Sequence, residues 1–153
     1  MPTEADYIHS AKGIAVKIVA DAYAWIELFA GTRKGEFAKS TMEEAETVIT
    51  PDTVLAEVAR KYIREGIKEE TTRQRLSTIM EASVPAYIDD AVAIEAGKAY
   101  LQLERRAKDA GLKKPSLFDA LVLAVARKGD GKVLTGDEHF EGLPETIWMN
   151  TLC

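Results

Sequence analysis

The segment from residue 14 to residue 29 constrains the fold most, because its hydrophobic pattern changes at a single acid, Asp21. Residues 14–20 are short, mostly apolar and rich in β-branched side chains, which is typical of a strand buried on both faces of a parallel sheet. After Asp21, the large side chains of Trp25, Leu28 and Phe29 recur at helical spacing. We therefore expect the chain to turn from strand to helix at Asp21.

An acid at this turn has two explanations. Aspartate is a preferred N-cap, because its carboxylate accepts hydrogen bonds from the first backbone N–H groups of a helix. Open α/β sheets also bind their ligands at the carboxyl ends of the strands, where Asp21 would lie. Taken alone, the cap is the simpler explanation, so a chemical role for Asp21 requires further acids at the same edge.

The length and composition fit one compact domain. At 153 residues with 46% hydrophobic residues, the chain has enough apolar surface for a core, and we expect residues 1–13 to be a loose lead-in and residues 14–153 to be a single domain. The net charge of −5 removes the simplest electrostatic argument for nucleic-acid binding. The single cysteine, Cys153, allows no intramolecular disulfide and no cysteine metal cluster, which fits a reducing cytoplasm.

Residues 13–31 are apolar enough to be tested as a membrane span. Lys17, Asp21 and Glu27 interrupt the segment, and charges in the middle of a membrane are costly. The first dozen residues carry acids where a signal peptide would carry a basic region. We therefore expect no membrane association and a cytoplasmic location.

The rest of the chain alternates between strand and helix patterns. Strands are expected at 47–50, 83–87, 132–135 and 146–149, and helices at 52–65, 67–81, 90–110 and from 117. Thr50 is expected to cap the helix from 52, Arg33 and Lys34 to lie in a basic loop, and 36–45 to form a polar link with some helical character. This alternation predicts an α/β fold, with a parallel sheet of four or five strands between two helical layers.

Three acids are expected at one edge of this sheet. Asp21 and Asp137 each follow a predicted strand, and Asp119 lies in the first turn of an apolar helix. Asp119 also has a structural explanation, since Ser116 and Asp119 have the spacing of a capping box. Carboxylates brought together repel one another, so such a cluster indicates a cation, and oxygen ligands favour Mg²⁺ or Mn²⁺. The chemistry that fits best is metal-assisted phosphodiester hydrolysis.

Glu57 gives a weaker signal. Val54 and Val58 belong to the apolar stripe of the predicted helix from 52, and Glu57 lies roughly 60° away from Val54 at about 100° per residue. Periodicity alone therefore predicts a solvated surface acid.

Four motifs together carry a resemblance to a known family, although none is specific alone. They are Val-Ala-Asp-Ala-Tyr-Ala-Trp around Asp21, Val-Leu-Ala-Glu-Val-Ala around Glu57, Leu-Phe-Asp-Ala-Leu-Val-Leu-Ala around Asp119 and Leu-Thr-Gly-Asp-Glu-His-Phe around Asp137. In order, spacing and strand context, the chain from about residue 15 to its end resembles a PIN-domain ribonuclease of the VapC toxin type, found in VapBC toxin–antitoxin pairs.

The resemblance implies both a site and an activity. The site would be an acidic metal pocket of Asp21, Glu57, Asp119 and Asp137, with Asp21 and Asp119 the foremost direct ligands of Mg²⁺ or Mn²⁺. Thr135 would hold a carboxylate or a water in place. The activity would be cleavage of structured RNA, tRNA or rRNA, by a homodimeric toxin of a type II system that is inhibited by a small VapB-like antitoxin. The chain departs from the family in one place, at Ala22, where Ser or Thr is common and a hydroxyl is therefore absent.

Several further residues receive expectations. The candidates for RNA contact are basic residues, namely Arg33, Lys34, Arg73, Arg75, Arg105 and Arg106. His139 is expected to be a surface or packing residue, because no second histidine is spaced to bind a metal with it, and Trp25 and Trp148 are expected in the core. The polar helix at 67–81 has so thin an apolar stripe that it is expected to be an arm packed against a partner.

Other functions fit less well or remain open. A haloacid-dehalogenase-like phosphatase needs a second Asp two residues after Asp21, where Tyr23 stands. A receiver-type signalling domain would need an acidic pair after the first strand, and the pair at 89–90 follows the third predicted strand. A PIN-domain RNA-processing nuclease without an antitoxin, and a catalytically silent PIN-like module that binds RNA or protein, both remain as alternatives.

Overall fold

A five-stranded parallel sheet forms the centre of the molecule in the computed structural model, which describes residues 16–152. The strands are β1 (Lys17–Ala20), β2 (Thr47–Pro51), β3 (Val84–Ala86), β4 (Lys132–Thr135) and β5 (Thr146–Trp148). The predicted lead-in at 1–13 and the first residues of the first predicted strand lie outside the described residues. The parallel sheet predicted from the sequence is thereby confirmed.

The strand order β3-β2-β1-β4-β5 places β1 in the middle of the sheet. Val19 of β1 is in register with Ile49 of β2 on one side and with Val133 of β4 on the other. The chain builds the sheet outward from β1 through β2 and β3, and then crosses back to form β4 and β5. This reversal creates a switch point between the carboxyl ends of β1 and β4, where open α/β sheets hold their ligands.

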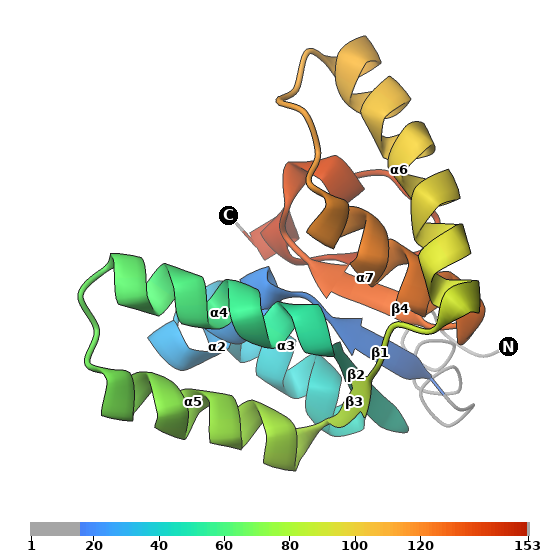
Figure 1. The fold of residues 1–153 in the computed structure, drawn as a ribbon. Coiled ribbons are helices and arrows are strands. Elements are labelled where there is room, and N and C mark those ends of the chain that lie inside the picture. The colour runs from blue at the N-terminus through green and yellow to red at the C-terminus, as the bar shows by residue number, and fades with distance from the viewer. Residues whose placement is uncertain (1–15, 153) are drawn as a thin grey trace, which may run out of the picture.

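Helices cover both faces of the sheet (Figure 1). They are α2 (Ala22–Ala30), α3 (Arg33–Glu44), α4 (Asp52–Arg64), α5 (Glu69–Ala82), α6 (Asp90–Ala110) and α7 (Leu117–Lys128), followed by the short 3-10 turns η1 (Glu138–Phe140) and η2 (Met149–Leu152). Successive residues of β1 point to opposite faces. Val19 packs in the larger core with residues of α4, α6 and α7, and Ile18 packs in the smaller core with Ala38 of α3.

The segment after Gly31 corrects two sequence predictions. Arg33 and Lys34 are not in a loop but in the first turn of α3, because the Thr32 hydroxyl accepts a hydrogen bond from the Gly35 N–H at 3.0 Å and caps the helix. The link predicted at 36–45, for which some helical character was expected, belongs to this complete helix. It packs closely on α2, and a Cβ atom at Gly35 would overlap the Glu27 carbonyl oxygen.

Thr50 does not cap α4, contrary to the sequence prediction. Its hydroxyl accepts a hydrogen bond from the Trp25 indole N–H at 3.1 Å and shares another with the Ser83 hydroxyl at 2.8 Å. Pro51 stands at the cap position of α4 without a side-chain hydrogen bond. Thr50 therefore ties α2 to β2 and to the start of β3.

The two tryptophans differ in burial. Trp25 is 2% exposed and lies in the core, as expected, whereas Trp148 on the edge strand β5 is half-buried. In α5, Thr72 and Ile79 are buried while Met80 is exposed, and the packing of this helix against a partner stays a prediction. Within residues 16–152, no helix is long and apolar enough to cross a membrane.

Candidate active site

Asp21 directly follows the central strand and is 4% exposed. Its Oδ1 accepts a hydrogen bond from the Ala22 N–H at 2.8 Å, so it does cap α2. Its Oδ2 accepts a second hydrogen bond at 2.8 Å from the hydroxyl of Thr135, at the end of β4. The cap explanation is thus correct, and it uses one carboxylate oxygen while the other faces the switch point.

Thr135 links two acids across neighbouring strands. Its fully buried hydroxyl donates to Asp21 and accepts a hydrogen bond from the backbone N–H of Asp137 at 3.0 Å. The turn after β4 is therefore held against the end of β1. The structure places Thr135 where the resemblance implied, with a carboxylate as its partner.

Asp119 lies in the first turn of α7, a helix that is buried from Asp119 to Ala126. The predicted capping box is present, with the Ser116 N–H donating to Asp119 Oδ2 at 2.9 Å and the Asp119 N–H donating to the Ser116 hydroxyl at 3.1 Å. This local structure fixes the orientation of Asp119 at the start of the central helix. Like Asp21, Asp119 caps a helix and also lies beside the other acids.

Glu57 is not the solvated acid that periodicity predicted. It is half-buried, and its Oε1 is buried without a hydrogen-bond partner among the described residues. The reason is tertiary, because Glu57 lies beside Ala22 and Ile26 of α2, with which it lines the same cavity. A helical wheel describes one helix by itself, so it cannot show that α2 lies beside Glu57.

The four acids line one cavity of about 330 Å³ at the carboxyl edge of the sheet. Its lining consists of Asp21, Ala22, Tyr23, Ile26, Glu27, Glu57, Lys61, Asp119 and Asp137. The structure thus brings together all four acids singled out from the sequence.

Burial and mutual repulsion raise the pKa values of these acids. Burial is the largest cause for Asp21, followed among the raising effects by the charges of Asp119 and Asp137, and its pKa rises to about 7 although the Thr135 hydroxyl opposes this. Burial and the charge of Asp21 raise the pKa of Glu57 to about 8. Burial and the charge of Asp137 also raise the pKa of Asp119. Negative charge is therefore unfavourable here without a compensating cation.

His139, expected from the sequence to be a surface or packing residue, lies beside two of the acids. Its Nδ1 lies 2.9 Å from Asp137 Oδ1 and 4.0 Å from Asp119 Oδ2, and its Nε2 lies 2.8 Å from the Lys113 carbonyl oxygen. Burial lowers the pKa of His139, but the Lys113 carbonyl and Asp137 outweigh this effect and raise it. Asp119, Asp137 and His139 each offer one atom that could bind a metal, and these three atoms lie within 4.8 Å of one another. The sequence does place His139 two residues after Asp137, and this spacing could have predicted their contact without a second histidine.

Comparison with known families decides the class of this fold and site. The PIN-domain family matches residues 18–145, which is most of the chain. The chain belongs to the PIN-domain family. No curated protein matches it.

Several solved structures similar to this PIN domain are described as toxins or toxin–antitoxin complexes. A toxin–antitoxin complex from Klebsiella pneumoniae is 22% identical, with 86% of this chain and 97% of that chain covered and a TM-score of 0.61. VapBC2 from Rickettsia felis, bound to a promoter DNA fragment, is 15% identical, with 87% and 97% covered and a TM-score of 0.66. VapC20 from Mycobacterium tuberculosis, a sarcin–ricin loop cleaving toxin, is 19% identical, with 84% and 95% covered and a TM-score of 0.63.

The basic residues selected from the sequence lie in different settings in this PIN domain. Arg73 pairs with Glu69 at 2.8 Å, and the Arg75 guanidinium stacks 4.5 Å from the centre of the Tyr62 ring. Lys34 donates to the hydroxyl of Tyr23, which lines the acidic cavity, at 3.3 Å. Lys34 therefore contacts a residue that lines the cavity of the four acids.

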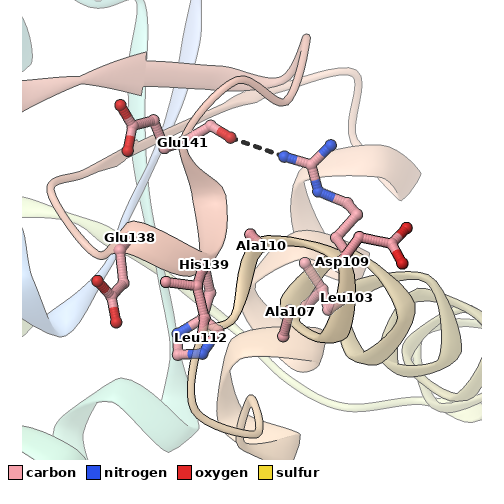
Figure 2. Close-up of a pocket in the computed structure, with 9 residues that line it drawn as sticks. Leu103, Ala107, Asp109, Ala110, Leu112, Glu138, His139 and Glu141 are labelled. Carbon is pink, nitrogen blue, oxygen red and sulfur yellow. Dashed lines mark hydrogen bonds between the residues drawn. The ribbon is translucent and has the colours of Figure 1, made fainter.

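A second cavity, of about 600 Å³, lies between α6 and η1 (Figure 2). Arg106 is one of its lining residues and donates from Nη2 to the Glu141 carbonyl oxygen at 2.7 Å. His139 reaches both this cavity and the acid cluster. The acids that line this larger cavity, Asp109, Glu138 and Glu141, are different from the four acids that line the smaller one.

Proposed function

We propose that this protein is a Mg²⁺- or Mn²⁺-dependent endoribonuclease that hydrolyses RNA phosphodiester bonds as the toxin of a type II toxin–antitoxin pair in the cytoplasm. The observation that carries the proposal is the gathering of Asp21, Glu57, Asp119 and Asp137 around one cavity at the switch point of the sheet. Membership of the PIN-domain family supports a nuclease rather than another use of these acids.

The donor set fits a hard divalent cation. The cavity presents carboxylate oxygens, which suit Mg²⁺ and Mn²⁺, and one Glu57 oxygen is buried with no hydrogen-bond partner among the described residues. We assign Asp21 and Asp119 as the principal ligands, with Asp137 and Glu57 completing the set. When bound, such a cation supplies Lewis acidity at the scissile phosphate and lowers the pKa of coordinated water.

The protein's own residues orient the reaction. Thr135 holds Asp21 in place, and the capping box holds Asp119, so neither ligand has to reorganise when RNA binds. The unpartnered oxygen of Glu57 is available to bind the cation or to accept a proton from the attacking water. Attack by the water oxygen forms one P–O bond and breaks the P–O bond to the leaving oxygen, which takes up a proton, so that the proton count is conserved.

The substrate and partners follow from the neighbours. We propose structured RNA, tRNA or rRNA, as the substrate, since the similar VapC20 is described as cleaving the sarcin–ricin loop. We propose a small VapB-like antitoxin as a partner, because several similar structures are toxin–antitoxin complexes.

We also propose that the protein is a homodimer. Large apolar side chains, including Tyr87 and Leu101, are more than 60% exposed and would be covered by a second subunit. Light scattering of the purified protein should give the mass of two chains, and the mass of one chain would contradict the dimer.

The decisive activity test uses one acid and a matched control. Purified protein should cut structured RNA with Mn²⁺ or Mg²⁺ and stop cutting when a chelator is added. Asp119→Asn should lower the cleavage rate at least 100-fold while leaving the fold intact, because asparagine can still accept the hydrogen bond from Ser116. Asp130→Asn removes the same charge at an exposed residue with φ of 52°, a conformation that asparagine tolerates, and should cut like wild type. Equal cleavage by Asp119→Asn and wild type would refute the assignment.

A further inference from the structure

Another hollow, different from the cavity between α6 and η1, adjoins the acidic cavity on the side of α4. It has a volume of about 410 Å³ and is lined by Ala22, Ile26, Glu57, Arg60, Lys61, Arg64 and Glu65. Four of these residues, Ala22, Ile26, Glu57 and Lys61, also line the acidic cavity. The two hollows therefore lie next to each other, and we refer to them together as a groove with an acidic end and a basic end.

Three cations follow Glu57 along one flank of α4. Arg60, Lys61 and Arg64 are three, four and seven residues after Glu57, so they share its side of the helix. At about 1.5 Å of rise per residue, the series extends roughly 10 Å from the acids. This distance places positive charge beside the site without placing it among the carboxylates.

These cations are available to a ligand. Lys61 pairs with Glu65 at 3.3 Å, but both side chains are nearly half exposed, and such a surface pair is weak. Arg64 is exposed and makes no ion pair with any described residue. The Arg60 guanidinium lies 5.8 Å from the centre of the Phe118 ring, an arrangement that leaves its edge N–H donors free to bind a phosphate.

The charge of the whole molecule makes these cations necessary for binding RNA. With a net charge of −5 and a cavity of four acids, the protein repels a polyanion at long range. Attraction must therefore come from cations next to the site. Arg73 and Arg75, the α5 candidates chosen from sequence, are already engaged by Glu69 and Tyr62.

We propose that the basic end of the groove, formed by Arg60, Lys61 and Arg64, binds the backbone phosphates of the RNA strand on one side of the scissile bond. This inference rests on the proposed ribonuclease function. It assigns substrate affinity to α4 and chemistry to the acids. The phosphates would lie along the α4 flank, with the next phosphate along the strand reaching the acidic end.

The test measures RNA binding separately from cleavage. A fluorescent single-stranded RNA is titrated with protein in chelator at several salt concentrations, in an Asp119→Asn background. Lys61→Gln/Arg64→Gln should bind roughly tenfold more weakly at low salt, and its slope of log affinity against log salt should be shallower by about 1.4. Arg60 is left intact because it packs on Phe118 beside Asp119. Arg64→Lys should retain the slope.

The control removes the same charge elsewhere. Lys98→Gln/Lys108→Gln changes two exposed lysines on α6, which lies away from α4 in Figure 1, and should bind RNA like the parent. Equal affinity and slope for the α4 and α6 variants would overturn the inference, even if the wild-type protein cuts RNA. A loss of binding confined to the α4 variant would support it, even if no RNA is cut, in which case the proposed function alone fails.

Discussion

Thr135 is the residue on which the geometry of the acids depends most. Its hydroxyl is hydrogen-bonded to both Asp21 and Asp137. Because Thr135 is fully buried, water cannot take over these hydrogen bonds if the hydroxyl is removed. Asp21 and Asp119 each cap a helix and also line the acidic cavity. Their local hydrogen bonds fix the orientation of both carboxylates in the acidic cavity.

Replacing Thr135 tests this positioning role. Thr135→Val keeps the shape but leaves the Asp137 N–H and one Asp21 oxygen unpaired, which should cost about 1–3 kcal/mol of the free energy of unfolding. Loss of such a supporting bond should also weaken Mn²⁺ affinity roughly 10- to 100-fold. Thr135→Ser keeps the hydroxyl and should restore most of the affinity. Calorimetric titration with Mn²⁺ measures both variants, and wild-type affinity in Thr135→Val would exclude this role.

The raised pKa values predict how stability depends on pH. Asp21 and Glu57 hold protons in the folded state up to about pH 7 and 8, whereas in the unfolded chain they lose them near 3.8 and 4.5. The folded state therefore binds more protons between these limits, and the free energy of unfolding should decrease as pH rises from about 5 to 8.

Urea unfolding in chelator at several pH values measures this dependence. Asp21→Asn should flatten it, because the asparagine does not titrate. Saturating Mn²⁺ should also reduce the decrease in the free energy of unfolding at high pH, since the deprotonated acids are the proposed ligands. A wild-type stability that rises over this range would contradict the burial of the acids.

At the scale of elements, strands and apolar helices were predictable, but polar and contact-dependent features were not. The turn from β1 to α2, the cap of α6 at Asp89 and the box at Ser116 all follow local rules. The helix α3 was predicted only in part because its sequence is polar, and its stability depends on packing through Gly35 and Ala38. Thr50 has the pattern of a cap, yet Trp25 and Ser83 compete successfully for its hydroxyl.

Gly35 is the position at which α3 depends most on close packing. Gly35→Ala would force Cβ into the Glu27 carbonyl, so α3 must move away from α2, and the free energy of unfolding should decrease by about 1–3 kcal/mol. Gly97, in the middle of α6, has open space around it. Gly97→Ala should instead stabilise the protein by about 0.5–1 kcal/mol. Thermal unfolding of both variants measures the difference, and equal effects would mean that the α2–α3 contact is not tight.

At the scale of the molecule, the topology brings distant acids together. Residues 21, 119 and 137 are far apart in sequence, but parallel strands ending at one edge make their meeting predictable. Glu57 was not predictable from its own helix, because α2 lies beside it. The position of His139 beside the acids was not predicted for a related reason, since its partner Lys113 belongs to the connection between α6 and α7. Local patterns therefore identify the acids at strand ends and helix starts, and tertiary packing brings Glu57 and His139 beside them.

Mn²⁺ binding to the purified protein tests the central claim most directly. Isothermal titration of wild type, Asp21→Asn and Asp130→Asn separates a site made by the acids from a general effect of charge, since each variant removes one negative charge. Wild type and Asp130→Asn should bind Mn²⁺ with the same affinity, and Asp21→Asn should bind at least tenfold more weakly. No binding by wild type, or equal binding by all three proteins, would contradict the assignment of the acidic cavity as a metal site.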